Sequence, residues 1–546
     1  MKLKKTHLYL LSLLSGLLLT FGWPANGLPF LLFIGFVPLL LIEEHIYNNK
    51  ENFNNFSFFG YSYIAMFIWN LLTTYWIYFS TAFGAALAII CNAMFMALVL
   101  SFFHYSRRVL KHNSAYIIFI IFWITFEYLH LDWDLSWSWL NLGNGFANYP
   151  ALVQWYEYTG AFGGTLWILL VNFMIFYTIK LFISKEKTLK SRLLFLAGCG
   201  DLILIPIITS VCIYYTYGNN GKPVNVVVVQ PNIDPYNEKF GGMPSEKQIE
   251  KFLKLARLKT DNNTDLLIGP ETAIPEGVWE NELEVSRSID SLKHFLKTHP
   301  QLSILIGMSS YKMFEKGEHI SETARIYDVV DNDTLWIDAY NTAILLDTSL
   351  NIQVYHKSKL VPGVEKMPFP KLLKPLEKFA FDLGGTTGSL GVQDERSVLY
   401  SCDGIIKAAP VICYESIYGE YVSEYVKNGA NIICIITNDG WWENTPGHKQ
   451  HCNYARLRAV ETRRDIARSA NTGISCFINQ RGDVSDATSW WKDDVIRKNL
   501  LLNEEKTFYV KYGDYIARTA LYMSAVILFY IIFLSVSLRL KSIRKK

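Results

Sequence analysis

The chain has 546 residues, of which 51% are hydrophobic and 18% charged, and its formal net charge is +3. A soluble protein of this length would carry charge on about a quarter of its residues, so the composition argues against a wholly soluble protein. The small net charge, with no basic patch or aromatic ladder, argues against nucleic-acid binding. The apolar excess is gathered into long runs, which is typical of membrane spans.

Seven apolar runs precede residue 218 and one lies near the C-terminus, each close to the roughly 20 residues that a bilayer requires. The first run resembles a cleavable signal peptide, but no clean small-residue cleavage site follows it, so we interpret it as a retained anchor. The second run is short and could be tilted or partly interfacial. The predicted spans are residues 6–22, 28–42, 56–78, 82–104, 115–131, 164–184, 194–215 and 519–538.

Basic residues are confined to alternate loops. They occur at the N-terminus, near residues 107–111, near 185–192 and in the tail from 539 to 546, whereas the long loop from 131 to 164 contains no Lys or Arg. By the positive-inside rule, both termini are therefore expected in the cytoplasm. The region that follows the seventh span is expected on the opposite face of the membrane.

The sequence predicts three parts. Residues 1–217 are expected to form a transmembrane bundle of about seven helices, and residues 511–546 a final transmembrane helix with a basic cytoplasmic tail. Residues 218–510 are expected to form an extracytoplasmic catalytic domain. The fold class is thus a membrane α-helical bundle of about eight spans joined to an α/β domain.

In the region 218–510 the pattern changes to strands that alternate with amphipathic helices. Several strand candidates are continuous apolar runs, as expected of strands buried on both faces. One helix is expected to begin at Ser245, with Gln248 completing a capping box, and another to span about 450–464. This mixture predicts a layered α/β domain with helices outside the sheets. The strand candidates are 224–229, 265–268, 302–306, 341–346, 352–355, 405–413, 431–437 and 474–479.

The eight cysteines are scattered, and three of them fall in predicted spans. None forms a C-x-x-C pair, so neither a zinc site nor a dense disulfide framework is indicated. The five thiols in the extracytoplasmic domain leave room for one disulfide, which the sequence does not assign.

Cys413 ends one of the buried apolar runs. Tyr414 and Glu415 follow it directly, so the thiol is expected at the edge of a sheet. The thiolate is the reactive form of cysteine, so such a residue needs a nearby cation or base. Cys434, inside the apolar run 432–436, fits instead the ordinary state of a buried cysteine.

Two other strand ends offer the missing partners. Glu271 follows the strand 265–268 with a proline nearby on each side, and a carboxylate fixed beside a thiol can serve as a general base. Taken alone, it could equally be a solvated loop carboxylate. Lys357 and Lys359 follow the strand 352–355, and a lysine there would stabilise an oxyanion and lower the pKa of the thiol. Both could also be exposed surface lysines, and their spacing does not decide between them.

Glu, Lys and Cys in this order, each at a strand end, resemble the constellation of the nitrilase (carbon–nitrogen hydrolase) superfamily. Over nearly its whole length the chain resembles the phospholipid-dependent apolipoprotein N-acyltransferases, which join a membrane bundle to a nitrilase-like domain and a final span. The resemblance implies a four-layer αββα sandwich and assigns the lysine role to Lys357. The matching motifs are Pro270-Glu271, Tyr355-x-Lys357-x-x-Leu360-Val361-Pro362-x-x-Glu365, Cys413-Tyr414-Glu415, Asn438-Asp439-x-Trp441, Ala455-Arg456-x-Arg458-Ala459-x-Glu461 and Arg468-Ser-Ala-Asn471-Thr-Gly473.

The resemblance implies a two-step acyl transfer. Glu271 would take the proton of Cys413, whose thiolate attacks a phospholipid ester, while Lys357 holds the oxyanion. The resulting thioester would then acylate the α-amine of the N-terminal diacylglyceryl-cysteine of an apolipoprotein. No metal or other cofactor is expected, because thioester-to-amide transfer is downhill. The implied partners are a phospholipid donor, the diacylated acceptor and membrane lipids, with no nucleic acid, and the protein is expected to be a monomer.

The same resemblance implies that Glu365, Tyr414, Glu415 and Trp441 support catalysis or shape the path by which substrates reach the thiol. For Trp441, simple anchoring at the water–lipid interface is an equal alternative. The implied location is the bacterial inner membrane, with the catalytic domain in the periplasm. Two rival functions stay open: a membrane-tethered amidase or nitrilase that uses the same three residues, and a non-enzymatic protein with a degenerate nitrilase-like domain.

Overall fold

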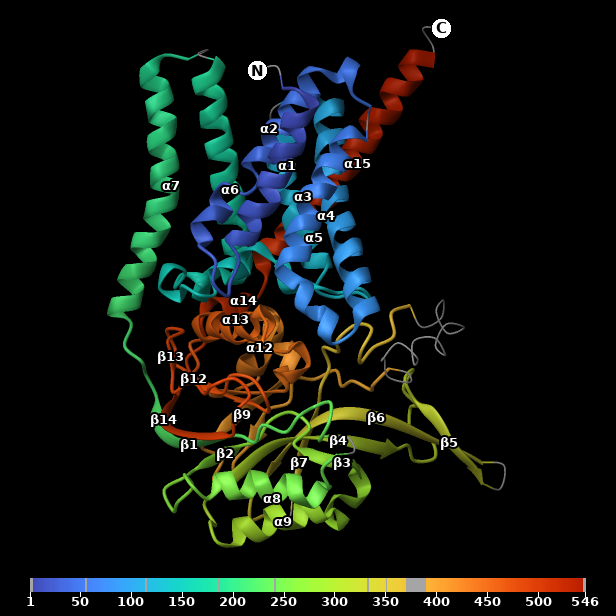
Figure 1. Ribbon diagram of the computed structural model, residues 1–546, viewed down its shortest axis with the longest axis vertical. Coiled ribbons are helices and arrows are strands. Elements are labelled where there is room, and N and C mark those ends of the chain that lie inside the picture. The colour runs from blue at the N-terminus through green and yellow to red at the C-terminus, as the bar shows by residue number, and fades with distance from the viewer. Residues whose placement is uncertain are drawn as a thin grey trace. The chain divides into compact units, whose positions relative to one another are not determined.

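The computed structural model describes residues 3–54, 56–112, 115–184, 187–239, 242–330, 333–349, 351–369 and 389–543. The chain divides into two compact units (Figure 1). The first consists of Met1–Tyr78, Ala82–Tyr215 and Tyr512–Lys546, and the second of Phe79–Thr81 and Thr216–Lys511. Five basic residues of the orientation argument lie outside the described residues: Lys2, Lys185, Arg544, Lys545 and Lys546.

The first unit is helical. In the part of the chain that the structure describes, five helical segments are long and apolar enough to cross a membrane: Pro29–Asn48, Ala82–Leu110, Tyr156–Ser184, Leu189–Thr216 and Tyr515–Leu538. A membrane-spanning bundle is therefore confirmed, while the full count of eight spans stays a prediction. The long helices of this unit are α1 (Lys5–Phe21), α2 (Val37–Asn48), α3 (Ser57–Thr74), α4 (Ala82–Leu110), α5 (Ala115–Leu129), α6 (Tyr156–Ser184), α7 (Leu189–Thr216) and α15 (Tyr515–Ile543).

The buried charged residues Arg107 and Glu127 of this unit have ion-pair or hydrogen-bond partners, as the low dielectric of a membrane interior requires. Arg107 was predicted to be a loop residue. It lies instead in the last turn of α4 and is buried against Glu43 and Glu44 of α2. Glu127 of α5 is also buried, and its carboxylate accepts hydrogen bonds from Trp123 Nε1 at 2.9 Å and Thr165 Oγ1 at 2.7 Å. These carboxylates therefore join helices inside the bundle.

The second unit contains two β-sheets. Among the residues that the structure describes, the first sheet has eight strands in the order β14-β1-β2-β4-β6-β5, with β3 on β4 and β7 on β6, and the second has six in the order β13-β12-β11-β10-β9-β8. The strands are β1 (Lys222–Gln230), β2 (Leu266–Ile268), β3 (Ile274–Trp279), β4 (Ser303–Met313), β5 (Arg325–Val330), β6 (Asp333–Leu346), β7 (Gln353–His356), β8 (Leu399–Tyr400), β9 (Lys407–Ile412), β10 (Ile432–Thr437), β11 (Ile466–Ala470), β12 (Cys476–Ile478), β13 (Val484–Ser485) and β14 (Asp494–Leu502).

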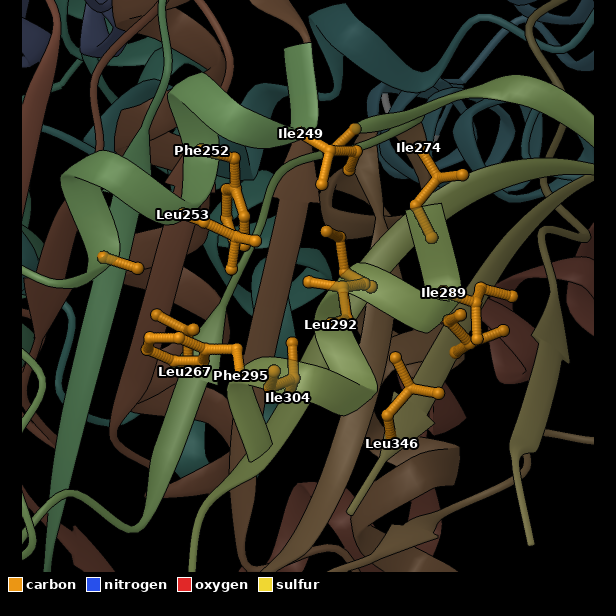
Figure 2. Close-up of a cluster of buried hydrophobic side chains, with 14 of the residues drawn as sticks. Ile249, Phe252, Leu253, Leu267, Ile274, Ile289, Leu292, Phe295, Ile304 and Leu346 are labelled. Carbon is orange, nitrogen blue, oxygen red and sulfur yellow. The ribbon is translucent and has the colours of Figure 1, made fainter. Parts of the chain in front are cut away.

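The burial of β1 explains the layering. Alternate side chains of a strand point to opposite faces, and both sets are buried here. Val227 and Val229 belong to a core cluster formed with α8 (Ser245–Ala256) and α9 (Arg287–Lys297), whose apolar side chains Figure 2 shows against the sheet. The opposite face is covered by the second sheet, since Ser469 Oγ of β11 donates to Val229 O at 2.9 Å.

Helices α12 (Gly419–Lys427) and α13 (Pro446–Thr462) contact β9 and β12 of the second sheet. The second unit thus has the predicted α/β architecture, in the order helices, sheet, sheet, helices. The helix predicted to begin at Ser245 is confirmed as α8, but its predicted capping box is wrong. Pro244 precedes the helix without a side-chain cap, and Gln248 Nε2 donates instead to the main-chain oxygens of Lys239 (3.0 Å) and Met243 (2.9 Å).

Candidate active site

Cys413 lies where β9 leaves the second sheet. The strand pairs in parallel with β10, and Cys413 opens the short 3₁₀ helix Cys413–Ile417. Its φ of 49° lies in the left-handed region, which is strained for a residue other than glycine and is often found at functional sites. Only 8% of the residue is exposed. The fold therefore holds the thiol in one orientation at the end of a buried strand.

Glu271 follows β2 in the first sheet and is buried. Its Oε1 accepts hydrogen bonds from Asn341 Nδ2 at 2.7 Å and Lys357 Nζ at 3.1 Å, and its Oε2 accepts one from Asn438 N at 3.0 Å. Burial alone would raise the pKa of Glu271, but the charge of Lys357 and the hydrogen bond from Asn341 bring it below its usual value. The carboxylate is therefore ionised and fixed in position.

Lys357 follows β7 and lies between two carboxylates. Its Nζ donates to Glu365 Oε1 at 2.7 Å and to Glu271 Oε1 at 3.1 Å, and its side chain is 1% exposed. Burial opposes the charged form, yet the two carboxylates raise the pKa of Lys357 well above its usual value. Lys359 instead places its Nζ 5.3 Å from the centroid of the Tyr418 ring. Of the two candidate lysines, Lys357 is the one in contact with Glu271.

The three predicted catalytic side chains influence each other electrostatically. Burial and then the Glu271 carboxylate raise the pKa of the Cys413 thiol, while the Lys357 ammonium lowers it. The balance leaves the thiol protonated at neutral pH, so the nucleophile needs a base at the moment of attack. Glu271 has the charge and the fixed position for this role.

Glu415 joins the cysteine turn to the lysine strand. It is fully buried, and its carboxylate accepts hydrogen bonds from Ile412 N (2.8 Å), Ser358 N (2.7 Å) and the Tyr355 hydroxyl (2.7 Å). The residue fastens together the two main-chain segments that carry Cys413 and Lys357.

We expect Glu415→Ala to lower the free energy of unfolding of this unit by about 3 kcal/mol or more, because two main-chain N–H groups and two tyrosine hydroxyls would lose a buried carboxylate acceptor. Acylation of Cys413 should fall as well. Thermal unfolding and thioester formation would be measured beside Glu424→Ala. Glu424 lies on α12 with an exposed side chain, so its removal should change neither quantity. Equal behaviour of the two variants would contradict the fastening role.

The other predicted supporting residues differ in their surroundings. Glu365 anchors Lys357 and is itself held by Val361 N at 2.9 Å. Tyr414 is buried, with its ring edge-on to Tyr418 at 5.3 Å. Trp441 is half-buried and lies edge-on to the Tyr236 ring at 5.2 Å. Of these residues, Glu365 contacts the predicted triad directly.

Several residues that sequence reasoning missed complete the site. Asn341 Nδ2 bridges Glu271 and Glu365, and Lys239 Nζ donates to Glu271 O at 3.1 Å. Behind Cys413, His451 Nε2 lies 3.1 Å from Cys413 O, and its Nδ1 lies 2.9 Å from Asp439 Oδ1. Asp439 had a signal, since it belongs to one of the matching motifs. Lys239 and Asn341 had none.

Among the described residues, no group of three or more His, Cys, Asp or Glu side chains is arranged to hold a metal ion. The cysteines are free thiols, and Cys452 Sγ lies 3.7 Å from Cys476 Sγ, beyond the length of a disulfide bond. The reactive and charged groups described at this site are the Cys413 thiol, the Glu271 and Glu365 carboxylates, and the Lys357 and Lys239 ammonium groups.

Two known protein families match consecutive parts of this chain. Residues 15–174 match the family model of the apolipoprotein N-acyltransferase N-terminal domain, and residues 226–506 match that of the carbon–nitrogen hydrolases. An apolipoprotein N-acyltransferase of Chlorobaculum tepidum is 30% identical over 539 residues, covering 95% of both chains. The chain belongs to the apolipoprotein N-acyltransferase family.

Other members of the apolipoprotein N-acyltransferase family match over similar lengths. The enzyme of Geobacter metallireducens is 28% identical, covering 95% of this chain and 94% of its own. Apolipoprotein N-acyltransferase 1 of Treponema denticola is 26% identical, with 93% of each chain covered. Both extend across the helical unit and the α/β unit, so the likeness is to the whole two-unit architecture.

Proposed function

We propose that this protein transfers an acyl chain from a membrane phospholipid to the α-amino group of the N-terminal diacylglyceryl-cysteine of apolipoproteins, the last step of bacterial lipoprotein maturation. The observation that carries the proposal is the buried contact between Glu271 and Lys357, two charged groups that both act on the pKa of the buried Cys413 thiol. The membrane bundle on the same chain gives this chemistry a lipid-embedded substrate.

In the first step, Glu271 removes the proton from the Cys413 thiol and the sulfur attacks the ester carbonyl carbon of the phospholipid. Negative charge develops on the carbonyl oxygen, where the Lys357 ammonium and nearby main-chain N–H groups stabilise it. When the intermediate collapses, the carbon–oxygen bond to the glycerol breaks and Glu271 returns its proton to the leaving alkoxide. The products are a lysophospholipid and a thioester on Cys413.

In the second step, the α-amine of the acceptor attacks the thioester carbonyl, and Glu271 accepts a proton from the nitrogen. The carbon–sulfur bond breaks, and the thiolate is reprotonated as the amide leaves. Glu365 keeps Lys357 in place through both steps by its 2.7 Å contact. Transfer of an acyl group from a thioester to an amine is downhill, so the two half-reactions need no further energy source.

The experiment that tests this proposal is mass spectrometry of the purified protein after incubation with a defined phospholipid. A mass increase of one acyl chain on the peptide that contains Cys413, removed when a diacylated lipopeptide is added, is the expected result. An amidase or nitrilase would release the acyl group to water or turn over small amides instead. A protein that forms no adduct with either substrate class would support the non-enzymatic alternative.

The proposal also fixes the side of the membrane on which the α/β unit must lie. We expect a membrane-impermeant thiol reagent to label a cysteine introduced at Asn219 from the periplasm, and a reporter fused after Lys546 to read as cytoplasmic. The reason is that the lipid-modified acceptor cysteine is displayed on the outer face of the inner membrane. Labelling at Asn219 from the cytoplasm would place enzyme and acceptor on opposite sides and overturn the proposed function.

A further inference from the structure

Lys239 is a lysine of the site that the mechanism above does not use. It lies in the segment after β1 and is 4% exposed. Its Nζ donates to the main-chain oxygen of Glu271 at 3.1 Å. A buried lysine is rare unless its charge serves a specific partner, and here the partner is the residue assigned as the general base.

The main chain around Lys239 is fixed before any substrate binds. Lys239 N donates to Asp234 O at 2.9 Å, and Lys239 O accepts a hydrogen bond from Gln248 Nε2 of α8 at 3.0 Å. The main chain of Lys239 is therefore anchored through both its N–H group and its carbonyl oxygen, which limits where the ammonium can lie. This pre-organisation distinguishes Lys239 from a surface lysine that folds inward by chance.

The carbonyl that Lys239 contacts belongs to a strained turn. Thr272, which follows Glu271, has a φ of 48°, in the left-handed region. The backbone of Gly307 packs so closely beneath that an added Cβ would lie 2.6 Å from Thr272 N and 2.8 Å from Glu271 Cα. The hydrogen bond from Lys239 satisfies the carbonyl of this turn, and the turn aims the Glu271 carboxylate.

The charges of the site balance only when Lys239 is counted. Glu271 and Glu365 contribute two negative charges, while Lys357, the cation between them, contributes one positive charge. Two further acids lie near the thiol. Asp439 is paired with Arg468 at 2.7 Å, and Glu415 is held by hydrogen bonds from Ile412 N, Ser358 N and the Tyr355 hydroxyl. An uncompensated charge in a buried site is costly, and Lys239 supplies the second positive charge beside the Glu271 and Glu365 carboxylates.

We propose that Lys239 is a positioning residue for the first half-reaction: its ammonium holds the Glu271 turn and balances the second carboxylate, so that a thiolate can form at Cys413. This inference rests on the proposed function, but the effect of Lys239 on the Cys413 thiol can be measured on the enzyme without substrate. The titratable groups that face Lys239 are Glu271 and Cys413, while Gln248 on the packed helix α8 is neutral.

A pH dependence accompanies this role. Burial lowers the pKa of Lys239 to about 8, and the charges of Glu271 and Cys413 only partly oppose the shift. The cation is therefore present below about pH 8 and lost above it. Formation of the Cys413 thiolate should become harder as the pH rises through this value, so the pH profile of Cys413 reactivity should be shallow on its alkaline side.

The test compares the full-length wild-type protein with three variants: Lys239→Met, Lys239→Arg and Lys251→Met. Lys251 is the matched control because its Nζ also donates to a main-chain oxygen, that of Asn232 at 3.2 Å, and pairs with Asp493 away from Glu271. The first readout is the rate at which iodoacetamide alkylates Cys413, resolved by peptide mass spectrometry across the neutral to alkaline range. The second is thioester formation with a phospholipid.

We expect Lys239→Met to alkylate about tenfold more slowly at neutral pH, with its profile displaced to higher pH, because one nearby cation is lost. Thioester formation should fall in parallel, and Lys251→Met should match the wild type in both. Lys239→Arg should retain the neutral-pH rate and show a steeper alkaline rise, because arginine keeps its charge there. If Lys239→Met does not fold, the Lys239→Arg profile alone decides.

A Lys239→Met profile equal to that of the wild type, or a Lys239→Arg profile with an unchanged alkaline side, would overturn the inference and leave Lys239 a purely structural residue. Failure of the proposed function is recognised separately. In that event the wild type itself forms no thioester with phospholipid, while the alkylation comparison still reports on Lys239.

Discussion

Cys413→Ala should abolish both thioester formation and transfer to the acceptor, reducing activity by roughly 10⁴-fold or more. The thiol is the nucleophile in the proposed mechanism, and no other side chain at this strand end can replace it. The small alanine side chain leaves the buried surroundings of the turn intact, so the protein should remain folded. Intact-protein mass spectrometry after incubation with phospholipid measures the loss directly.

Cys434→Ala is the matched control. Cys434 lies inside β10, the strand beside β9, and is fully buried. Burial alone raises the pKa of its thiol, with no charged partner nearby to oppose the shift. We expect its removal to leave acylation near the wild-type level with only a small loss of stability. Loss of acylation in this variant, with Cys413 intact and the protein folded, would contradict the assignment of Cys413.

The three residues assigned as the triad could be located at strand ends from the sequence. Glu271 and Cys413 follow short apolar runs, whereas Lys357 follows the mixed strand β7. Such a run marks a strand inside the core, and the polar residue that ends it marks the point where the chain leaves the sheet. Cys413 follows β9, Glu271 follows β2 and Lys357 follows β7, as the sequence indicates. Their convergence was an inference from family resemblance, since strand ends do not reveal which edges meet.

Lys239 and Asn341 could not be predicted as site residues, because their burial depends on distant parts of the chain. Lys239 lies in a polar loop and resembles a surface lysine until α8 and the Glu271 turn close over it. Asn341 was taken as the start of a strand, whereas β6 begins eight residues earlier at Asp333. Its polar side chain lies in mid-strand because it serves Glu271 and Glu365.

Strand β11 was not among the strands predicted from the sequence, because it carries a buried charged residue. Arg468 in its centre is fully buried and donates to Asp439 Oδ2 at 2.7 Å. A charged residue in a short segment suggests a loop when only the local pattern is considered, since lone buried charges are rare. The pairing partner lies 29 residues away in the chain. Strands that carry functional polar residues are therefore the ones that local patterns identify least well.

Lys357→Met should reduce thioester formation by about 10²- to 10³-fold, because the oxyanion of the first step loses its positively charged partner. It should also lower the free energy of unfolding by about 3–5 kcal/mol, since Glu271 and Glu365 would remain buried without the cation between them. Both quantities would be measured on the same preparation, by acyl-enzyme mass spectrometry and thermal unfolding. A variant that accumulates a stable thioester would show that Lys357 acts after the first step.

Lys359→Met separates the role of Lys357 from a general effect of removing positive charge. The two lysines are two residues apart, but Lys359 contacts the Tyr418 ring, whereas Lys357 contacts the two carboxylates. A cation near an aromatic ring contributes about 0.5–1 kcal/mol at a partly exposed site. We therefore expect Lys359→Met to keep substantial acylation and nearly normal stability. If both variants lose acylation equally while folded, the contact between Lys357 and Glu271 is not what the reaction requires.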